Sequence, residues 1–139
     1  MKKLCLLLAS GVVVLAFNAP SAHAVLTFKK AFEAKYKVKT AKTDSQKSLA
    51  AAVKKAKCNV CHKGKKKKDH NAYGLALKKF LDKDNFKPKR RKAEPEKVKK
   101  EIWDALKKVE SMKGDKGPTF GELIKAGNLP AGDLAADKK

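Results

Sequence analysis

The segment Cys58-Asn-Val-Cys61-His62 brings two thiols and an imidazole together within five residues. Residues three and four apart lie on one face of a helical turn, so both sulfurs and the imidazole would point to the same side. Cys-x-x-Cys-His is the attachment signature of c-type haem, in which each thiol adds across one vinyl group of the porphyrin. His62 would bind the iron as the proximal ligand. The motif therefore predicts one covalently attached haem c.

Two other uses of these side chains compete with haem attachment. A zinc site would recruit Cys58, Cys61, His62 and His70, but structural zinc sites use two ligand pairs separated by a folded spacer. His62 follows Cys61 directly, which makes it hard for both to point at one tetrahedral centre. A thioredoxin-like dithiol needs a βαβ setting, and the chain has no strand pattern. Haem attachment remains the reading that fits the spacing.

The ligand on the opposite face of the iron has two candidates, and an open sixth position is the third alternative. His70 lies eight residues beyond His62, and eight extended residues reach about 26–29 Å, more than is needed to pass around a haem edge. Met112 stands where cytochrome c-like chains commonly take a distal methionine, but it also continues an apolar helical stripe. We favour His70, and two histidines would give a lower reduction potential than histidine with methionine.

Residues 1–24 have the order of a secretory signal peptide. Lys2 and Lys3 give a basic start, Leu4 to Phe17 is apolar and uncharged, and Ala22-His-Ala24 has the small residues of a cleavage site. The apolar run is shorter than the roughly 18 residues that span a bilayer. Cleavage after Ala24 would release the chain into the periplasm or an equivalent extracytoplasmic compartment, where bacteria attach haem covalently.

Residues 25–139 support a single domain. Only two cysteines would remain, and a disulfide across three positions would restrain little of the unfolded chain. A small domain with few apolar residues needs another stabilising group, which a haem would supply. We therefore expect an all-α, cytochrome c-like domain wrapped around one haem, with a loose tail over residues 128–139. Without the haem, we expect the chain to be largely unfolded.

Apolar spacing and capping residues predict five helices and no strand. The cluster KPKRRK at residues 87–92 is expected to break the helical pattern. The first helix passes through Phe28, Phe32 and Tyr36 with Thr27 as N-cap, and the second runs from near Asp44 toward Cys58. The third is capped by Asn71 and has Tyr73, Leu77, Phe80 and Leu81 on one face. The fourth begins at Pro95 and is ended by Gly114, and the fifth is opened by the capping box Thr119-Phe-Gly-Glu122 and ends near Gly127.

The segment CNVCHKGKKKKDHNAYG, residues 58–74, resembles a group of small exported c-type cytochromes of planctomycete bacteria. These have the haem motif, a lysine-rich loop and then Asn-x-Tyr-Gly, here Asn71, Tyr73 and Gly74. The closing GPTFGELIKAGNLP is similar to the C-terminal end of the family. The resemblance covers about half of the exported chain and implies a monohaem, mainly helical protein. Some relatives are thought to use a cysteine as distal ligand, in whose place His70 would stand here.

Lysine dominates the charge, which is +21 for the whole chain and +19 without Lys2 and Lys3. Such a charge suits a polyanionic partner. Nucleic acid is not expected, because few aromatic residues interleave with the basic ones and the signal-peptide pattern predicts export. Lys65, Lys66, Lys67 and Lys68 would instead steer an acidic redox partner to the haem edge. An anionic membrane surface is a further candidate, and a dimer is compatible with the sequence.

The function that these features predict is one-electron transfer by a monohaem c-type cytochrome. The alternative is a gas-binding or gas-sensing haem protein, which needs a weak or absent distal ligand, and a zinc-binding module ranks below both. Enzyme activity is not expected, since no distal acid/base pair is evident. His70 would serve a peroxidase-like reaction only if it stood back from the iron.

Overall fold

The computed structural model describes residues 23–64, 68–115 and 117–132 of the chain. Within these ranges the protein is all-α, as predicted, with two isolated bridges and no strand. The signal peptide expected at residues 1–24 lies outside the described residues except for its last two positions, which open the first helix. The elements are α1 (His23–Lys35), α2 (Asp44–Ala56), α3 (Ala72–Lys78), α4 (Pro88–Ala93), α5 (Pro95–Glu110) and α6 (Phe120–Lys125), with the 3₁₀ helices η1 (Lys57–Val60) and η2 (Lys83–Phe86).

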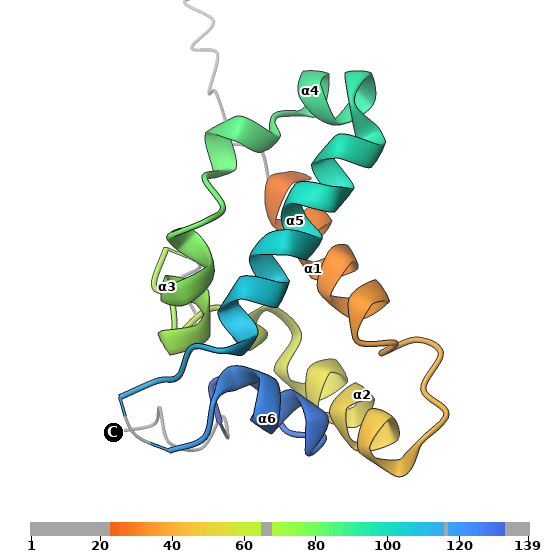
Figure 1. The fold of residues 1–139 in the computed structure, drawn as a ribbon, viewed down its shortest axis with the longest axis vertical. Helices are drawn as coiled ribbons and strands as arrows, with labels where there is room; N and C mark the ends of the chain where they lie inside the picture. Colours follow the sequence, from red (N-terminus) through yellow and green to blue (C-terminus); the bar gives the residue numbers. More distant parts are fainter. Residues whose placement is uncertain (1–22, 65–67, 116, 133–139) are drawn as a thin grey trace, which may run out of the picture.

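The helix α5 is the centre of the fold (Figure 1). It contacts α1, α3, α4 and α6, and α2 packs against α6 at the end of the molecule away from α4. The apolar stripe that the sequence predicts for α5 faces the core, and burial of such a stripe is the main source of stability for a helix of this length. The buried side chains of this stripe are Val98, Ile102, Ala105, Leu106 and Val109.

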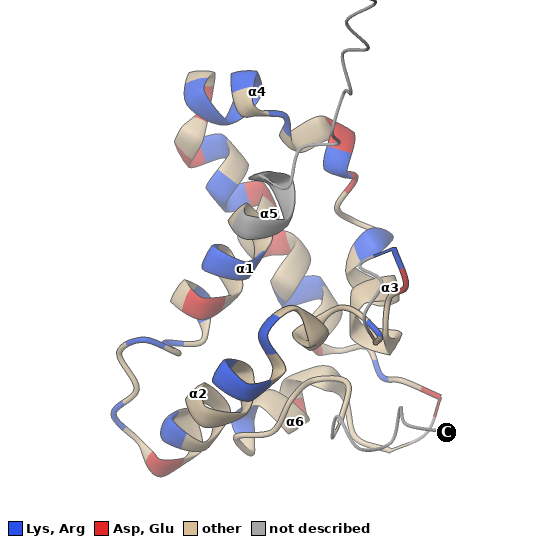
Figure 2. Cartoon of the chain, turned by 180° about the vertical axis from the view of Figure 1, so that it is seen from behind, with Lys and Arg blue, Asp and Glu red and all other residues tan. Residues whose placement is uncertain are grey.

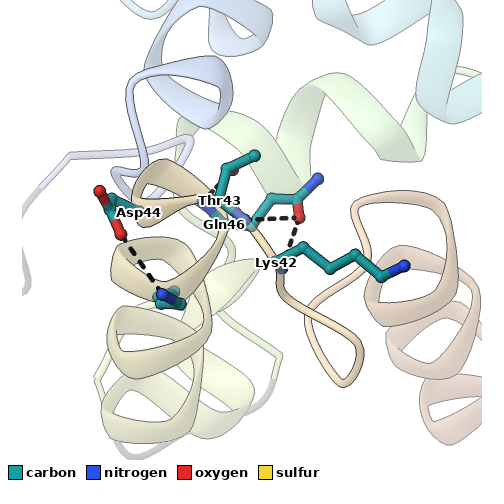
Figure 3. Close-up of polar contacts among 5 residues, drawn as sticks. Lys42, Thr43, Asp44 and Gln46 are labelled. Carbon is teal, nitrogen blue, oxygen red and sulfur yellow. Dashed lines mark hydrogen bonds and ion pairs between the residues drawn. The ribbon is translucent and has the colours of Figure 1, made fainter.

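Capping boxes fix the start of two helices. The backbone N–H of Gln46 donates to Oγ1 of Thr43 at 3.2 Å, and the Gln46 side chain accepts from the Thr43 N–H at 3.4 Å (Figure 3). Thr119 and Glu122 make the same exchange before α6, at 3.2 Å and 2.7 Å. Each pair satisfies two backbone donors that a helix start leaves unpaired. The predicted starts of α2 and α6 are therefore confirmed.

Three local expectations about the helices were wrong. Thr27 does not cap the first helix but lies inside α1, where its Oγ1 accepts a hydrogen bond from Arg91 at 2.6 Å. The cluster at 87–92 does not break the helical pattern, because Pro88 at the first position opens the short helix α4. Helix α5 ends at Glu110 rather than at Gly114, so Met112 lies in the connection to α6.

Two expectations about burial were also wrong. Phe80 does not join the buried face of α3, because that helix ends at Lys78 and the Phe80 side chain is 43% exposed. The start of the C-terminal segment is not loose, since Leu129 and Pro130 are buried. Residues 133–139 of the predicted tail lie outside the described residues.

Basic residues occur in several helices and connections of the described chain rather than in one helix (Figure 2). Each of the six α-helices in the described ranges has a basic side chain in its last turn, where the partial negative charge of the helix end favours a cation. Among the described helices, none has the length and apolar character to cross a bilayer.

Candidate haem-attachment site

The two cysteines and His62 share one turn of backbone directly after α2, which we call the attachment turn (residues 58–62). The carbonyl of Cys58 accepts hydrogen bonds from the N–H of Cys61 at 3.3 Å and from the N–H of His62 at 3.1 Å. Positions three and four beyond Cys58 are therefore held in one helical turn, as the spacing predicts.

Lys57 separates the attachment turn from α2. Its backbone has φ 53° and ψ −112°, a positive φ that residues other than glycine adopt at a cost of about 1–3 kcal/mol. The change of direction at Lys57 ends α2 at Ala56 and starts η1, so that Cys58 does not continue the helix. No local pattern indicates this strain, because lysine is an ordinary helix residue.

Both thiols are free and partly exposed. Burial raises the pKa of the Cys61 thiol to about 12, and the neighbouring Cys58 adds to the rise. Reactive dithiols have the opposite property, a pKa lowered toward neutrality. A pair of thiols one turn apart, with an imidazole next to the second, is the donor set that haem c requires, so the residues present fit this group.

His62 and His70 face each other across a short antiparallel pairing. The N–H of Lys63 donates to the carbonyl of Asp69 at 2.9 Å, and the N–H of Asn71 donates to the carbonyl of Cys61 at 3.2 Å. Directly opposed side chains in such a pairing project from the same side of the ribbon. The two imidazole rings accordingly lie with their centroids 4.7 Å apart, and His62 is buried.

This pairing brings the two histidines together but sets a condition on His70 as distal ligand. If His62 held a bound haem from one side, His70 would have to reach it from the other side. In the described arrangement both imidazoles project from one side of the ribbon. Ligation by both would therefore require the pairing of residues 61–63 with 69–71 to open.

Asn71 connects the attachment turn to the start of α3 through hydrogen bonds of its side chain. Its side-chain Nδ2 donates to the carbonyls of Asn59 at 2.9 Å and Val60 at 3.1 Å, and its Oδ1 accepts from the N–H of Gly74 at 2.9 Å. One buried amide thus caps α3, as predicted, and also satisfies two carbonyls of the attachment turn. The second role was not predicted, because an N-cap pattern is local and the turn lies more than ten residues earlier.

Gly74 allows α3 to touch the attachment turn directly. A Cβ at this position would lie 1.9 Å from the carbonyl oxygen of Cys61, closer than any real contact. The adjacent Tyr73 is fully buried, with its ring 5.3 Å from that of Phe120 in an edge-to-face arrangement. The Asn-x-Tyr-Gly sequence therefore has a physical role here: cap, core residue and point of closest approach.

Met112 is partly buried against the core, and its carbonyl accepts a hydrogen bond from the N–H of Phe120 at 2.8 Å. Gly114, two residues later, lies against Ala72 at the start of α3. The connection between α5 and α6 thus passes close to the segment that follows the attachment turn. Among the described residues, no group of three or more His, Cys, Asp or Glu side chains is arranged to hold a metal ion.

The predicted docking lysines are described only in part. Lys65, Lys66 and Lys67 lie outside the described residues, whereas Lys68 is exposed. Lys57, immediately before the attachment turn, is also exposed, and so is Leu75 on α3, which keeps 53% of its surface accessible. Lysines and one exposed leucine therefore lie close to the attachment turn along the chain.

Comparison of the chain with protein-family models, with curated proteins and with solved structures found no match. The case for a function therefore rests on the residues of the attachment turn and on what surrounds them.

Proposed function

We propose that the protein is a monohaem c-type cytochrome that carries single electrons in an extracytoplasmic compartment. The observation that supports this most directly is the geometry of the attachment turn. Two free, partly exposed thiols and an imidazole belong to one turn, and the Cys58 carbonyl fixes both the second thiol and His62 relative to the first. Cys58 and Cys61 would form the two thioethers, and His62 would be the proximal ligand.

A bound haem supplies an iron that takes up and releases one electron at a time. The chain would hold the haem in place and provide its surroundings. Asn71 and Gly74 hold the backbone of the attachment turn, and the apolar side chains around Tyr73 exclude water from its inner side. Fixed surroundings favour electron transfer, because little has to rearrange when the charge on the iron changes.

The ligand on the opposite face is proposed to be His70 or Met112. His70 can serve only if it leaves its pairing with His62, whereas Met112 lies in a connection that already passes near the start of α3. The same pairing supports the second candidate function, a gas-binding haem protein. If His70 stays beside His62 and Met112 does not reach the iron, the sixth position stays open.

The visible spectrum of the reduced protein, with and without carbon monoxide, separates the two functions. An electron carrier with both axial positions filled gives sharp low-spin bands that the gas does not change. A gas-binding protein shifts its bands when carbon monoxide is added. A shift at stoichiometric gas would overturn electron carriage as the leading function and favour the second candidate.

We further propose that the partner is an acidic redox protein that docks near the attachment turn, with Lys57 and Lys68 among the contacts. Exposed charges steer association over about 8–10 Å at moderate salt. The rate of electron transfer to an acidic partner should therefore fall steeply as salt is raised. A rate that stays constant between low and high ionic strength would contradict docking through these lysines.

A further inference from the structure

The three most easily oxidised aromatic side chains of the protein form one cluster. The whole chain contains only two tyrosines and one tryptophan, Tyr36, Tyr73 and Trp103. The Lys35 ammonium lies 5.7 Å from the centre of the Tyr36 ring and 5.9 Å from the centre of the Trp103 ring. The Phe32 ring contacts both tyrosine rings, with centroid separations of 4.7 Å and 6.0 Å.

The inner end of this cluster adjoins the attachment turn. Tyr73 is completely buried and precedes Gly74, the residue in closest contact with the Cys61 carbonyl. Burial raises the pKa of Tyr73, and the neighbouring Tyr36 and Cys61 raise it further. Among the described residues, no hydrogen bond of normal geometry is found for the Tyr73 hydroxyl, and the hydroxyl that interacts with it is that of Tyr36. Tyr73 therefore has no carboxylate in hydrogen-bond contact that could take its proton.

Tyr36 has such a base. Its hydroxyl donates to Oε1 of Glu110 at 3.0 Å, and the Lys35 ammonium lies 3.3 Å from the same oxygen. A phenol that loses an electron becomes a strong acid, and its proton must leave if the oxidised form is to persist. A carboxylate at 2.6–3.2 Å is within reach for that transfer.

We propose that Tyr36 is a redox-active residue that gives one electron to the oxidised haem, by way of Tyr73, while its phenolic proton moves to Glu110. This inference rests on the proposed haem attachment. Trp103, 38% exposed on α5, lies at the outer end of the route. The cluster would lead oxidising equivalents away from the porphyrin and toward the surface.

The oxidant is hydrogen peroxide, which would reach the iron where the sixth position is open or where peroxide displaces the ligand there. Hydrogen peroxide takes up two electrons and two protons and becomes two molecules of water. A bound haem would supply one of these electrons and Tyr36 the other, with the two protons drawn from solvent, and an external electron donor would later return one electron to the haem as well as one to Tyr36. Glu110 holds the proton from Tyr36 until that donor reduces the phenoxyl radical and the proton returns to the oxygen.

A purely structural role is the competing explanation for the Tyr36–Glu110 hydrogen bond, since it ties the end of α1 to the end of α5. That role predicts only a loss of stability when the bond is removed. The experiment therefore measures where an unpaired electron resides, which a structural bond would not control.

The exported protein is first shown to contain covalent haem by pyridine haemochrome analysis. Its ferric form is then mixed with one equivalent of hydrogen peroxide, freeze-quenched and examined by electron paramagnetic resonance. The wild type should give a tyrosyl radical that narrows when the protein carries ring-deuterated tyrosine. Tyr36→Phe should lower the tyrosyl yield at least about fivefold, and Glu110→Gln should do the same because it removes the base but keeps the shape. Tyr73→Phe interrupts the route and should also lower the yield, whereas Glu101→Gln, which removes a carboxylate of α5 outside the aromatic cluster, is the control and should keep the signal.

Three results would overturn the inference while leaving the proposed function intact. One is a haem-loaded wild type that gives no tyrosyl radical, and another is an unchanged yield in Tyr36→Phe. The third is a tyrosyl yield that Glu110→Gln leaves unchanged. A preparation without covalent haem would instead overturn the proposed function, and this inference with it.

Discussion

Replacing Gly74 by alanine tests how closely α3 is packed on the attachment turn. The added Cβ would lie 1.9 Å from the Cys61 carbonyl oxygen, 2.9 Å from the Cys61 carbonyl carbon and 3.1 Å from Cδ2 of His70. The two nearest atoms belong to the backbone, so neither can turn away as a flexible side chain would. The helix or the attachment turn must therefore move by about 1 Å, the kind of displacement that makes overpacked sites unstable.

The size of the effect follows from two opposing contributions. Overpacking at such a site costs about 3 kcal/mol, whereas glycine to alanine inside a helix normally gains about 1 kcal/mol. The net loss in the free energy of unfolding should be about 2 kcal/mol, which for a domain of this size lowers Tm by about 8 °C. The sign is thus opposite to the one that helix propensity alone predicts.

Thermal and denaturant unfolding of the haem-loaded protein, followed by circular dichroism and haem absorbance, measures this loss. Gly114→Ala is the matched control, because its Cβ would meet only the Ala72 Cβ at an ordinary 3.6 Å. That variant should stay within about 0.5 kcal/mol of the wild type. If Gly74→Ala were as stable as Gly114→Ala, the close packing of α3 on the attachment turn would be refuted.

Three further predictions concern the attachment turn and the iron. Asn71→Asp keeps the acceptor that caps α3 but removes the donor to the carbonyls of Asn59 and Val60. It should therefore lower the free energy of unfolding, measured by denaturant titration, by about 3 kcal/mol. A change near zero would show that these hydrogen bonds contribute nothing to stability. Lys57→Gly relieves the positive φ and should raise the free energy of unfolding by about 1 kcal/mol. Lys54→Gly, at an exposed position within α2, should lower it by about 1 kcal/mol. If both variants changed the free energy of unfolding in the same direction, the strain at Lys57 would be contradicted. His70→Ala and Met112→Ala each test one distal ligand by low-temperature electron paramagnetic resonance, and if neither changes the spectrum of the ferric haem, both assignments are wrong.

Local signals in the sequence predicted much of the helical framework. Helix α2 begins at Asp44, as predicted, Thr119 caps α6 through the predicted capping box, and Asn71 caps α3. These features depend on residues within one turn of each other, which a sequence displays directly. The apolar stripe of α5 could also be predicted from the sequence, because its period of about 3.6 residues identifies the buried face.

The errors come from contacts between distant parts of the chain. Threonine often caps helices, but the helix begins before Thr27, and the Thr27 hydroxyl accepts a hydrogen bond from Arg91, 64 positions away. Leu129 and Pro130 stand in a segment of loop-like composition, yet both are buried. No local pattern carries this information, since it depends on which surfaces meet after the helices have packed.

In the candidate site, too, local features were predicted from the sequence and contacts between distant residues were not. The spacing of Cys58, Cys61 and His62 predicted a shared turn, and the hydrogen bonds to the Cys58 carbonyl agree with it. The sequence did not predict the side-by-side position of His70, because its eight-residue separation from His62 is compatible with either face of a haem. It also did not indicate the hydrogen bond between Tyr36 and Glu110, whose partners are 74 positions apart.

Covalent attachment of haem through Cys58 and Cys61 is the central claim, and extraction of the purified protein with acidified acetone tests it most directly. The protein would be produced in a host that attaches haem c, with Cys58→Ser/Cys61→Ser prepared alongside. The account predicts that the pigment of the wild type stays with the polypeptide and gives a c-type pyridine haemochrome, while the double variant retains none. A colourless wild type, or one whose pigment passes into the acetone, would contradict the account.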